Sequence, residues 1–414
     1  MKILLATYWT LPHIGGVDLY IRQLQNGLER RGHKVDIFCR LPDGSGYSLL
    51  NKNKVVLRSA IHPLVKANVK GYFEDHCPAL DPLIQEMEVE RYAYELGAAY
   101  FDVSAYDLIH AQDIISAKAL SRIKKPNTAM VTTIHGHWTG EWFLTLQDQR
   151  LLDDPGRKQR LWQYASFREQ SGLIPADAAT LPTNWMRDIV SSDYAVPIEK
   201  LAVVPNGIDI SEFMKRMNAP TTFRSPAGKK VIICSARLDA IKGHKFLIRA
   251  LARLKQERDD WVCLLVGNGG LEFSLRELAK VHGIEANVLF MGQRGDVPAL
   301  LSQSHIFVLP SLQDNHPYAV MEAQVAGNAV IVSDAGGMPE MVNHGVTGLV
   351  FEKSNDEQLY QHLRTCLSDE QFRRYVSEEA RAFGHKHWSL DLMMERMSGI
   401  YETALARNRG GVRV

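Results

Sequence analysis

The sequence predicts an α/β protein made of two doubly wound, Rossmann-like domains in tandem. Short apolar runs, which are typical of buried strands, alternate with segments of helical periodicity along most of the chain. At 414 residues the chain is too long for one ordinary hydrophobic core, so two domains of roughly 150–200 residues are expected.

The first half opens with a β-loop-α-β unit. An apolar strand at Lys2 to Ala6 is followed by a loop rich in Pro, His and Gly, and then Val17 to Arg31 has helical spacing. The strand at Lys34 to Cys39 completes the unit. Later apolar runs repeat the alternation, which favours a parallel sheet covered on both faces; they are 108–110, 129–134, 179–182 and 201–204.

Residues 41–100 are less regular. Two basic segments with apolar or aromatic side chains, 55–72 and 141–175, fit helices that pack on the sheet, or helices that touch an acceptor or a lipid surface.

A second series of alternating strands and helices begins at Lys230, and we predict domains over 1–200 and 201–385. The expected strands are 231–235, 262–266, 288–291, 306–309 and 329–332. Residues 356–408 have a helical pattern with an interruption at 384–389.

The composition excludes several classes of protein. With 45% apolar and 23% charged residues, the chain fits a soluble globular protein, and a net charge of +1 implies no bulk attraction to nucleic acid. The five cysteines are scattered without CxxC spacing, which favours a reduced cytoplasmic protein with buried thiols. No run approaches the ~18 apolar residues of a membrane span, and MKILLATYW fits a buried strand better than a signal peptide.

The stretch Leu309 to Glu340 is the strongest candidate for a ligand site. A strand ends at Pro310, a helix is expected from Tyr318 to Val325, and a second strand runs into Gly336-Gly337. Two acids, Asp314 and Glu322, lie in the first loop and in the helix. In open α/β sheets ligands bind at the edge where these strands end.

Two cations follow the strand 231–235, at Arg237 and Lys242. They suit a diphosphate, whose leaving charge they could neutralise, although a pair of solvated surface cations would have the same sequence. Gly15-Gly16 before the first helix could let backbone amides approach an anion, or could be only a tight turn.

Asp314 and Glu322 have two possible roles. They could be the acid and base of glycoside hydrolysis, or each could accept hydrogen bonds from sugar hydroxyls, and we favour the second because they need not face each other. Asp-x-Asp is absent, which argues against a metal-chelated diphosphate. GxGxxG is absent too, which disfavours a dinucleotide dehydrogenase.

Eight segments spread over nearly the whole chain resemble the GT-B-fold retaining glycosyltransferases of family 4, also called glycosyl transferases group 1. They are PHIGGVDLYIRQL at 12–24, IHAQD at 109–113, TTIHG at 132–136, PNGID at 205–209, SARLDAIKG at 235–243, VGNGG at 266–270, the stretch 309–340 and HGVTGLV at 344–350. The resemblance implies that the N-terminal domain binds the acceptor, that the C-terminal domain binds a nucleotide-sugar donor, and that they face a cleft. Residues 386–408 would return to pack on the N-terminal domain.

The resemblance also implies residue roles on the donor side. Arg237 and Lys242 would hold the diphosphate, Glu322 the ribose, and Asp314 the donor sugar. His135 would lie beside the transferred sugar and Gly16 beside the phosphate. Phosphate or sugar contacts are also expected from the loop residues Asn315, His316, Pro317, Tyr318 and Ala319.

The chain departs from the family pattern at several of these positions. The first acid of the usual Glu-x7-Glu pair is Asp314, and Pro317 lacks an amide donor. Asp18 replaces a Glu and Gln112 stands where a second His is common, both on the acceptor side. His13 and His110 are further acceptor candidates, although structural or loop roles are favoured for both.

We therefore expect retaining, metal-independent transfer of a hexosyl group from a nucleotide-diphosphate sugar, with UDP favoured, to a saccharide or lipid-linked acceptor. The resemblance suggests cell-envelope or polysaccharide biosynthesis in the cytoplasm, possible peripheral contact with the membrane, and no bound cofactor. The alternatives are a sugar-nucleotide epimerase of the same fold and a non-catalytic nucleotide-sugar-binding protein.

Overall fold

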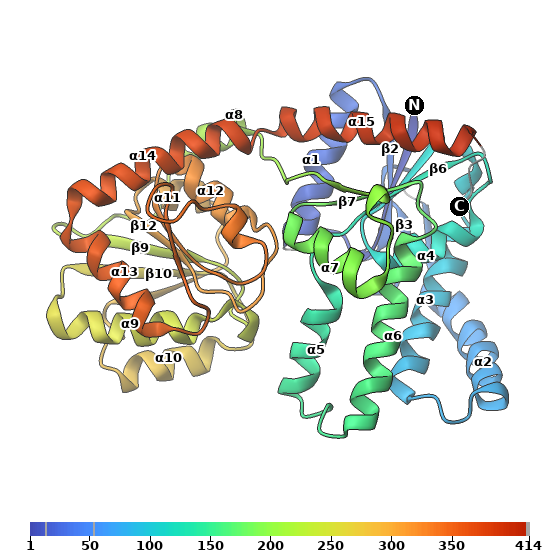
Figure 1. Cartoon of the computed structure of the whole chain (residues 1–414), viewed down its shortest axis with the longest axis horizontal. Helices are drawn as coiled ribbons and strands as arrows, with labels where there is room; N and C mark the ends of the chain where they lie inside the picture. The colour runs from blue at the N-terminus through green and yellow to red at the C-terminus, as the bar shows by residue number, and fades with distance from the viewer. Residues whose placement is uncertain (13–14, 53, 411–414) are drawn as a thin grey trace. The chain divides into compact units, whose positions relative to one another are not determined.

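The computed structural model describes residues 1–12, 15–52 and 54–410, which divide into two compact units (Figure 1). Unit 1 is Met1–Val204 together with the segment that begins at Met394, and unit 2 is Pro205–Met393. Each unit is a mainly parallel sheet with helices on its faces, so the predicted pair of Rossmann-like domains is confirmed.

The described residues of unit 1 form an eight-stranded sheet in the order β4-β3-β2-β1-β5-β6-β7-β8. Its pairs are parallel except for β2–β3 and β3–β4, which are antiparallel. The strands are β1 (Lys2–Thr10), β2 (Lys34–Arg40), β3 (Gly46–Leu49), β4 (Lys54–Leu57), β5 (Leu108–Ala111), β6 (Ala129–Thr133), β7 (Ala178–Leu181) and β8 (Leu201–Val203).

The strands β3 and β4, and the edge strand β14 (Leu349–Phe351) of unit 2, were not predicted from the sequence. The helical interpretation of 55–72 is wrong at its start, because Val55 and Leu57 lie in β4 and the helix begins at Arg58. β3 and β4 have only four residues each, and β4 is an edge strand whose Val55 and Leu57 are about half exposed (48% and 54%). The apolar run of β4 is only three residues long and leads directly into α2 at Arg58, so its sequence fits the helical pattern that follows.

Helices cover both faces of the unit 1 sheet (Figure 1). They are α1 (Gly16–Arg30), α2 (Arg58–His76), α3 (Pro82–Ala99), α4 (Ile114–Ile123), α5 (Trp138–Asp148), α6 (Pro155–Leu173), α7 (Asn184–Tyr194) and, from Met394 onward, α15 (Leu390–Arg409).

The last helix returns to unit 1 as predicted, but from Met394 and not from residue 386. A Cβ on Gly27 of α1 would meet Sδ of Met394 at 2.6 Å, so the side chain of Met394 packs directly on the backbone of α1 at this glycine. The hydroxyl of Tyr401 lies 2.8 Å from Nδ1 of His110 on β5. The expected interruption at 384–389 is narrower in the structure, because α14 continues through Gly384 to His387.

Unit 2 has a six-stranded parallel sheet in the order β11-β10-β9-β12-β13-β14. The strands are β9 (Lys230–Ser235), β10 (Trp261–Val266), β11 (Val288–Gly292), β12 (Ile306–Leu309), β13 (Ala329–Ser333) and β14 (Leu349–Phe351). The helices are α8 (Ile210–Met217), α9 (His244–Glu257), α10 (Glu272–Val281), α11 (Val297–Ser302), α12 (Tyr318–Ala326), α13 (Asp356–Ser368) and α14 (Glu370–His387).

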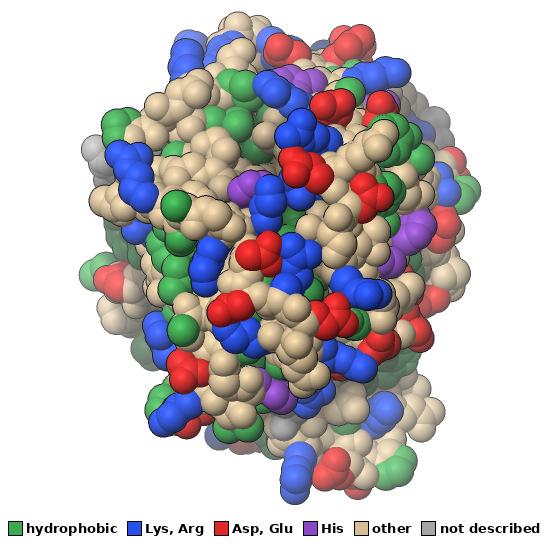
Figure 2. Space-filling model, turned by 90° about the vertical axis from the view of Figure 1, so that its left-hand side faces the viewer, with side chains coloured by type: hydrophobic (Ala, Val, Ile, Leu, Met, Phe, Trp, Pro, Cys, Tyr) green, Lys and Arg blue, Asp and Glu red, His purple; other side chains and the backbone are tan. Residues whose placement is uncertain are grey.

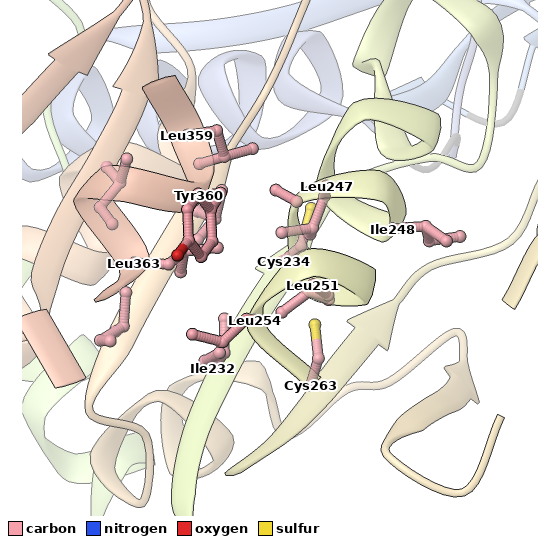
Figure 3. Close-up of a cluster of buried hydrophobic side chains, with 14 of the residues drawn as sticks. Ile232, Cys234, Leu247, Ile248, Leu251, Leu254, Cys263, Leu359, Tyr360 and Leu363 are labelled. Carbon is pink, nitrogen blue, oxygen red and sulfur yellow. The ribbon is translucent and has the colours of Figure 1, made fainter. Parts of the chain in front are cut away.

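The core of unit 2 lies between this sheet and its helices (Figure 3). Leu247 and Leu251 of α9 and Leu359 of α13 belong to one buried cluster with Ile232 and Cys234 of β9. These positions recur every three or four residues on the helices and every second residue on the strand, as two packed amphipathic faces require.

The surface of unit 2 in Figure 2 mixes basic and acidic side chains. Unit 2 has exposed ion pairs that join different helices or neighbouring turns; they are Arg253–Glu357, Arg364–Glu257 and Arg374–Glu370. Interspersed charges of both signs produce no single-sign field for a polyanion.

The cysteines are free, and four of the five are buried as predicted. Cys77 is the exception, since it is exposed after the end of α2. Among the described helices, none is long and apolar enough to cross a membrane.

Candidate functional site

Three neighbouring strands of unit 2 end side by side. β9, β12 and β13 are adjacent in the sheet and parallel, so the loops that follow them share its carboxyl edge. The loops 236–243 after β9 and 310–317 after β12 carry several of the predicted donor residues, and the loop 334–337 after β13 carries Gly336 and Gly337.

Lys242 and Asp314 form an ion pair across the first two loops. Nζ of Lys242 lies 2.6 Å from Oδ2 of Asp314, and the hydroxyl of Ser311 donates to the same oxygen at 3.0 Å. Burial alone would lower the pKa of Lys242, but the charge of Asp314 and its hydrogen bond outweigh that effect and raise the pKa. Lys242 therefore stays positively charged. Both of these bonds go to Oδ2 of Asp314, so its Oδ1 has no hydrogen bond in the described part of the chain.

Two glycines hold these loops in close contact. Gly243 has φ +67°, and a Cβ there would lie 2.0 Å from the carbonyl oxygen of Pro310. Gly336 has φ +64°, and a Cβ there would lie 1.8 Å from the carbonyl oxygen of Asp314, which also accepts from the amide of Gly337 at 3.0 Å. Only glycine permits both this backbone conformation and this approach.

Arg237 lies beside the same loop but faces solvent. Its side chain is 61% exposed, and its guanidinium is 3.3 Å from the carboxylate of Asp239. An exposed guanidinium can rotate toward a ligand, in contrast to the fixed ammonium of Lys242.

The loop from Asn315 to Pro317 leads into α12. Pro317 is the N-cap residue, so the first-turn amides of the helix, beginning at Tyr318 and Ala319, point out of its N-terminus. Asn315 and His316 are buried. This arrangement can hold an anion through backbone amides, with no donor from Pro317 itself.

His316 is held on two sides by residues from the beginning and the end of the sequence range of unit 2. The side-chain amide of Asn206 donates to its carbonyl oxygen at 3.0 Å, and its ring lies edge-on to Trp388, with centroids 4.9 Å apart. Burial lowers the pKa of His316 to about 3, so its ring is neutral near pH 7.

Glu322 lies on α12, half-buried. Its carboxylate has no hydrogen bond or ion pair among the residues that the structure describes, and burial raises its pKa to about 7, which the charge of Arg216 only partly opposes. Asp314 is not among the charges that act on it. A coupled acid–base pair is therefore disfavoured, and an unoccupied carboxylate that could accept from a diol fits better.

On unit 1 the carboxyl edge holds His135 and Gln112. Nε2 of His135 lies 3.1 Å from Oε1 of Gln112, and the imidazole ring is edge-on to Tyr20, with centroids 4.6 Å apart. Burial lowers the pKa of His135 to about 4. A neutral imidazole at the ends of β5 and β6 can exchange hydrogen bonds with a sugar.

The other acceptor candidates on unit 1 make different side-chain contacts. His110 is fully buried, and its two ring nitrogens contact the hydroxyls of Tyr401 and Thr133, so we assign it to the core and not to ligand binding. Asp18 pairs with Arg22 at 2.7 Å in the first turns of α1, which begins at Gly16. His13 lies outside the described residues.

Sequence reasoning missed Ser311, Asn206 and Trp388. Asn206 precedes a Gly and Trp388 lies in a helix connection, and neither position has a pattern that connects it to the loop 314–317 more than 70 residues away. Asn206 stands in the turn signal Pro-Asn-Gly, which could have drawn attention to it.

A possible metal-binding group lies elsewhere, on α2 and α3. His62, Glu86 and Glu90 have ligand atoms within 4.8 Å of one another, but Glu90 is already bonded to both Arg58 and His62. The guanidinium occupies the position of a counter-ion, so the cluster is accounted for without a metal.

Comparison with known proteins agrees with this architecture. The family model "Glycosyltransferase Family 4" matches residues 14–212, and "Glycosyl transferases group 1" matches residues 217–383. The chain is 26% identical over 416 residues to an uncharacterized glycosyltransferase of Methanocaldococcus jannaschii, covering 98% of this chain and 99% of the relative. It is 25% identical over 415 residues to N-acetyl-alpha-D-glucosaminyl L-malate synthase of Bacillus anthracis, covering 99% of both.

The solved structure of Anabaena HepE in complex with UDP-glucose has the same fold. Its TM-score is 0.66 at 19% identity, over 97% of this chain and 100% of HepE. Two Rossmann-like units with these loops at the strand ends define a glycosyltransferase of the GT-B fold. The chain belongs to glycosyltransferase family 4, the glycosyl transferases group 1.

Proposed function

We propose that this chain transfers a hexosyl group from a nucleotide-diphosphate sugar to a saccharide or lipid-linked acceptor, with retention of configuration and without a metal ion. The observation that carries the proposal is the half-buried Lys242, held at 2.6 Å from Asp314 beside the exposed Arg237. Such a fixed cation stabilises charge that develops on a leaving diphosphate.

The remaining donor contacts follow from the same loops. Asp314 would accept a hydroxyl of the donor sugar through Oδ1, since Oδ2 is held by Lys242 and Ser311. Glu322 would accept the two ribose hydroxyls, and the first-turn amides of α12 would bind phosphate or sugar. We favour a UDP-sugar because HepE, which has this fold, has been solved with UDP-glucose.

In the proposed reaction the bond between the anomeric carbon and the phosphate oxygen breaks, and the acceptor oxygen bonds to the same face of the sugar. The acceptor proton goes to the leaving phosphate. Arg237, Lys242 and backbone amides meet the phosphate charge, so no metal ion is needed. On unit 1 we assign His135 to the transferred sugar, Gly16 to the phosphate, and Gln112 and Asp18 to the acceptor side, in the cytoplasmic assembly of an envelope or secreted polysaccharide.

The test is to incubate the purified chain with UDP-, GDP- and ADP-sugars, with and without EDTA, and to measure the nucleoside diphosphate released. We expect release from one donor class, unchanged by EDTA. If no donor binds or is hydrolysed, the transferase proposal is wrong, and if EDTA abolishes release, the metal-free mechanism is wrong.

The product distinguishes the remaining alternatives. With an acceptor present, retention predicts that the anomeric configuration of the donor persists in the new glycoside, as NMR would show. An epimerase would instead return an altered sugar without any transfer product.

A further inference from the structure

Unit 1 contains a buried guanidinium that has no carboxylate partner. Arg168, on α6, is 5% exposed, and within the described part of the chain it makes no ion pair within 4 Å and no side-chain hydrogen bond. Arginine is rarely buried without a partner, because leaving water costs its charge several kcal/mol. An anion bound at this position would supply the partner that the guanidinium lacks.

Aromatic rings flank this guanidinium. Its central carbon lies 4.7 Å from the ring of Trp138 on α5 and 5.6 Å from the ring of Tyr164 on α6. Cation–π contacts offset part of the desolvation cost and hold the planar group, but they leave its N–H donors unused.

Two acids interact electrostatically with Arg168, and both accept hydrogen bonds from other groups. Glu88 accepts from Arg91 at 2.7 Å and from the hydroxyl of Tyr164 at 2.8 Å. Glu169 accepts the amide and the hydroxyl of Thr139 through Oε1, both at 3.1 Å, and its Oε2 is buried without a hydrogen bond among the described residues. Neither acid forms an ion pair with Arg168.

A second arginine without a carboxylate partner lies at the carboxyl edge of the sheet. Arg40 is the last residue of β2, half-buried, and its guanidinium lies 4.8 Å from the ring of Tyr8, near the end of the adjacent β1. The hydroxyl of Tyr8 has no hydrogen bond in the described residues. Tyr8 and Trp138 both pack against one apolar cluster, which connects the surroundings of the two arginines.

Of the charged side chains around Tyr8, the acids have bonded partners and the arginines do not. Burial raises the pKa of Tyr8, Glu90 and Asp113 add to that rise, and Arg40 and Arg168 oppose it, so all four charges lie within electrostatic reach of one hydroxyl. Glu90 is bound by Arg58 and His62, and Asp113 accepts from Thr7 and the amide of Tyr8. The acids have partners and the two arginines do not.

We propose that Arg168, Arg40 and the hydroxyl of Tyr8 bind an oxyanion, a phosphate or a carboxylate, carried by the acceptor. The inference rests on the proposed function, in which unit 1 binds the acceptor, and it specifies an acidic acceptor. The site lies at the ends of β1 and β2, next in the sheet to the strands that carry Gln112 and His135, so a charged group there would orient a sugar or polyol toward that pair. Guanidinium groups bind such oxyanions through paired, charge-assisted hydrogen bonds.

The test titrates the full chain with glucose, glucose 6-phosphate and glucuronate, which share one ring and differ in charge, and with inorganic phosphate. UDP is present at saturation to fill the donor site. We expect the charged probes to bind at least about tenfold more tightly than glucose, and calorimetry reports which oxyanion is preferred.

The variants locate the binding. Arg168→Gln should abolish the preference for charge and Arg168→Lys should restore part of it, while Arg160→Gln, an exposed position on the same helix, should leave it unchanged. Arg40→Gln changes the second arginine, at a half-exposed position, and the same binding is measured on it. Its melting temperature and circular dichroism confirm that this variant is folded. If no anion-dependent binding is seen, or if Arg168→Gln and Arg40→Gln both keep it, the proposal is overturned.

Donor turnover is measured on the same preparations and separates the two proposals. If UDP-sugar hydrolysis persists while the anion preference is absent, the oxyanion site is wrong and the transferase assignment stands. If anion binding depends on Arg168 but no nucleotide sugar binds, the oxyanion site stands and the proposed function fails.

Discussion

Lys242 is the residue whose charge the proposed chemistry uses most directly. Lys242→Ala removes one cation from the leaving diphosphate, and we expect turnover to fall by about 10²-fold or more. Lys245→Ala is the matched control, because Lys245 is an exposed lysine three residues further on, in α9. A near-normal rate in Lys242→Ala, measured as nucleoside diphosphate released, would remove this lysine from the phosphate site.

Glu322 predicts how donor affinity depends on pH. Its pKa is raised to about 7, so the carboxylate that should accept the ribose hydroxyls becomes protonated as pH falls through 7. Below that pH the dissociation constant of a nucleotide sugar should rise about tenfold per pH unit, as one lost ionisation requires. Calorimetric titrations from pH 5.5 to 8.5 measure it, and Glu322→Gln should remove the inflection. If the variant keeps the wild-type profile, another group is responsible.

Sequence reasoning identified the charged residues of this site but not their partners. Arg237, Lys242, Asp314 and Glu322 stand at predicted strand ends or in a predicted helix, so the topology alone brings the first three to one sheet edge. The Lys242–Asp314 pairing and the clamp of Asn206 on His316 depend on side-chain packing between segments over 70 residues apart. No periodicity encodes such contacts.

At the level of elements, the loops of the donor site depend on the approach of Gly336 to Asp314. Gly336→Ala places a Cβ 1.8 Å from the carbonyl oxygen of Asp314, so the loop 310–317 must move away. We expect donor affinity to fall by at least about tenfold, since a displacement near 1 Å disturbs the binding geometry.

Gly283→Ala is the control for backbone conformation. Gly283 has φ +66°, close to the +64° of Gly336, but no heavy atom lies within 4 Å of its added Cβ. Both variants should lose about 1 kcal/mol of stability from the left-handed backbone, and only Gly336→Ala should lose donor binding. Equal donor affinity in the two variants would show that the close contact does not shape the site.

The elements that the sequence predicted well are those with buried apolar runs. Most of the central parallel strands lie within about two residues of their expected bounds, because burial on both faces makes them continuously apolar, but β1 runs to Thr10, four residues beyond its expected end. β3 and β4 were missed because they are short, antiparallel and, at β4, exposed. The helix α14 continues through Gly384 to His387, where an interruption was expected, because a glycine costs a helix only about 1 kcal/mol.

At the scale of the whole molecule, buried histidines predict a protein that loses stability in acid. Burial lowers the pKa values of His110 and His316 to about 3 and of His135, His244 and His305 to about 4. The unfolded chain therefore binds these protons first, and stability falls as pH drops below 6.5. Glu169 and Glu322, whose pKa values are raised to about 7, act in the opposite direction between pH 7 and 4.5 but are fewer.

We expect the melting temperature to fall from pH 7 to pH 5, by differential scanning calorimetry. His244→Phe should reduce that fall, because both ring nitrogens of His244 are buried without a hydrogen bond among the described residues. Removing an unsatisfied polar group should also raise the melting temperature at pH 7. A melting temperature that is unchanged or higher at pH 5 would contradict the assignment of these histidines as neutral.

The central claim is that the loops of unit 2 hold the donor. Hydrogen–deuterium exchange of the wild-type chain, with and without the nucleotide sugar that it turns over, tests this claim most directly. We predict that the donor slows exchange in residues 237–243 and 314–322 and leaves the turn at 281–286 unchanged. Protection that appears elsewhere in the chain, with none in those two segments at a saturating donor concentration, would contradict the account.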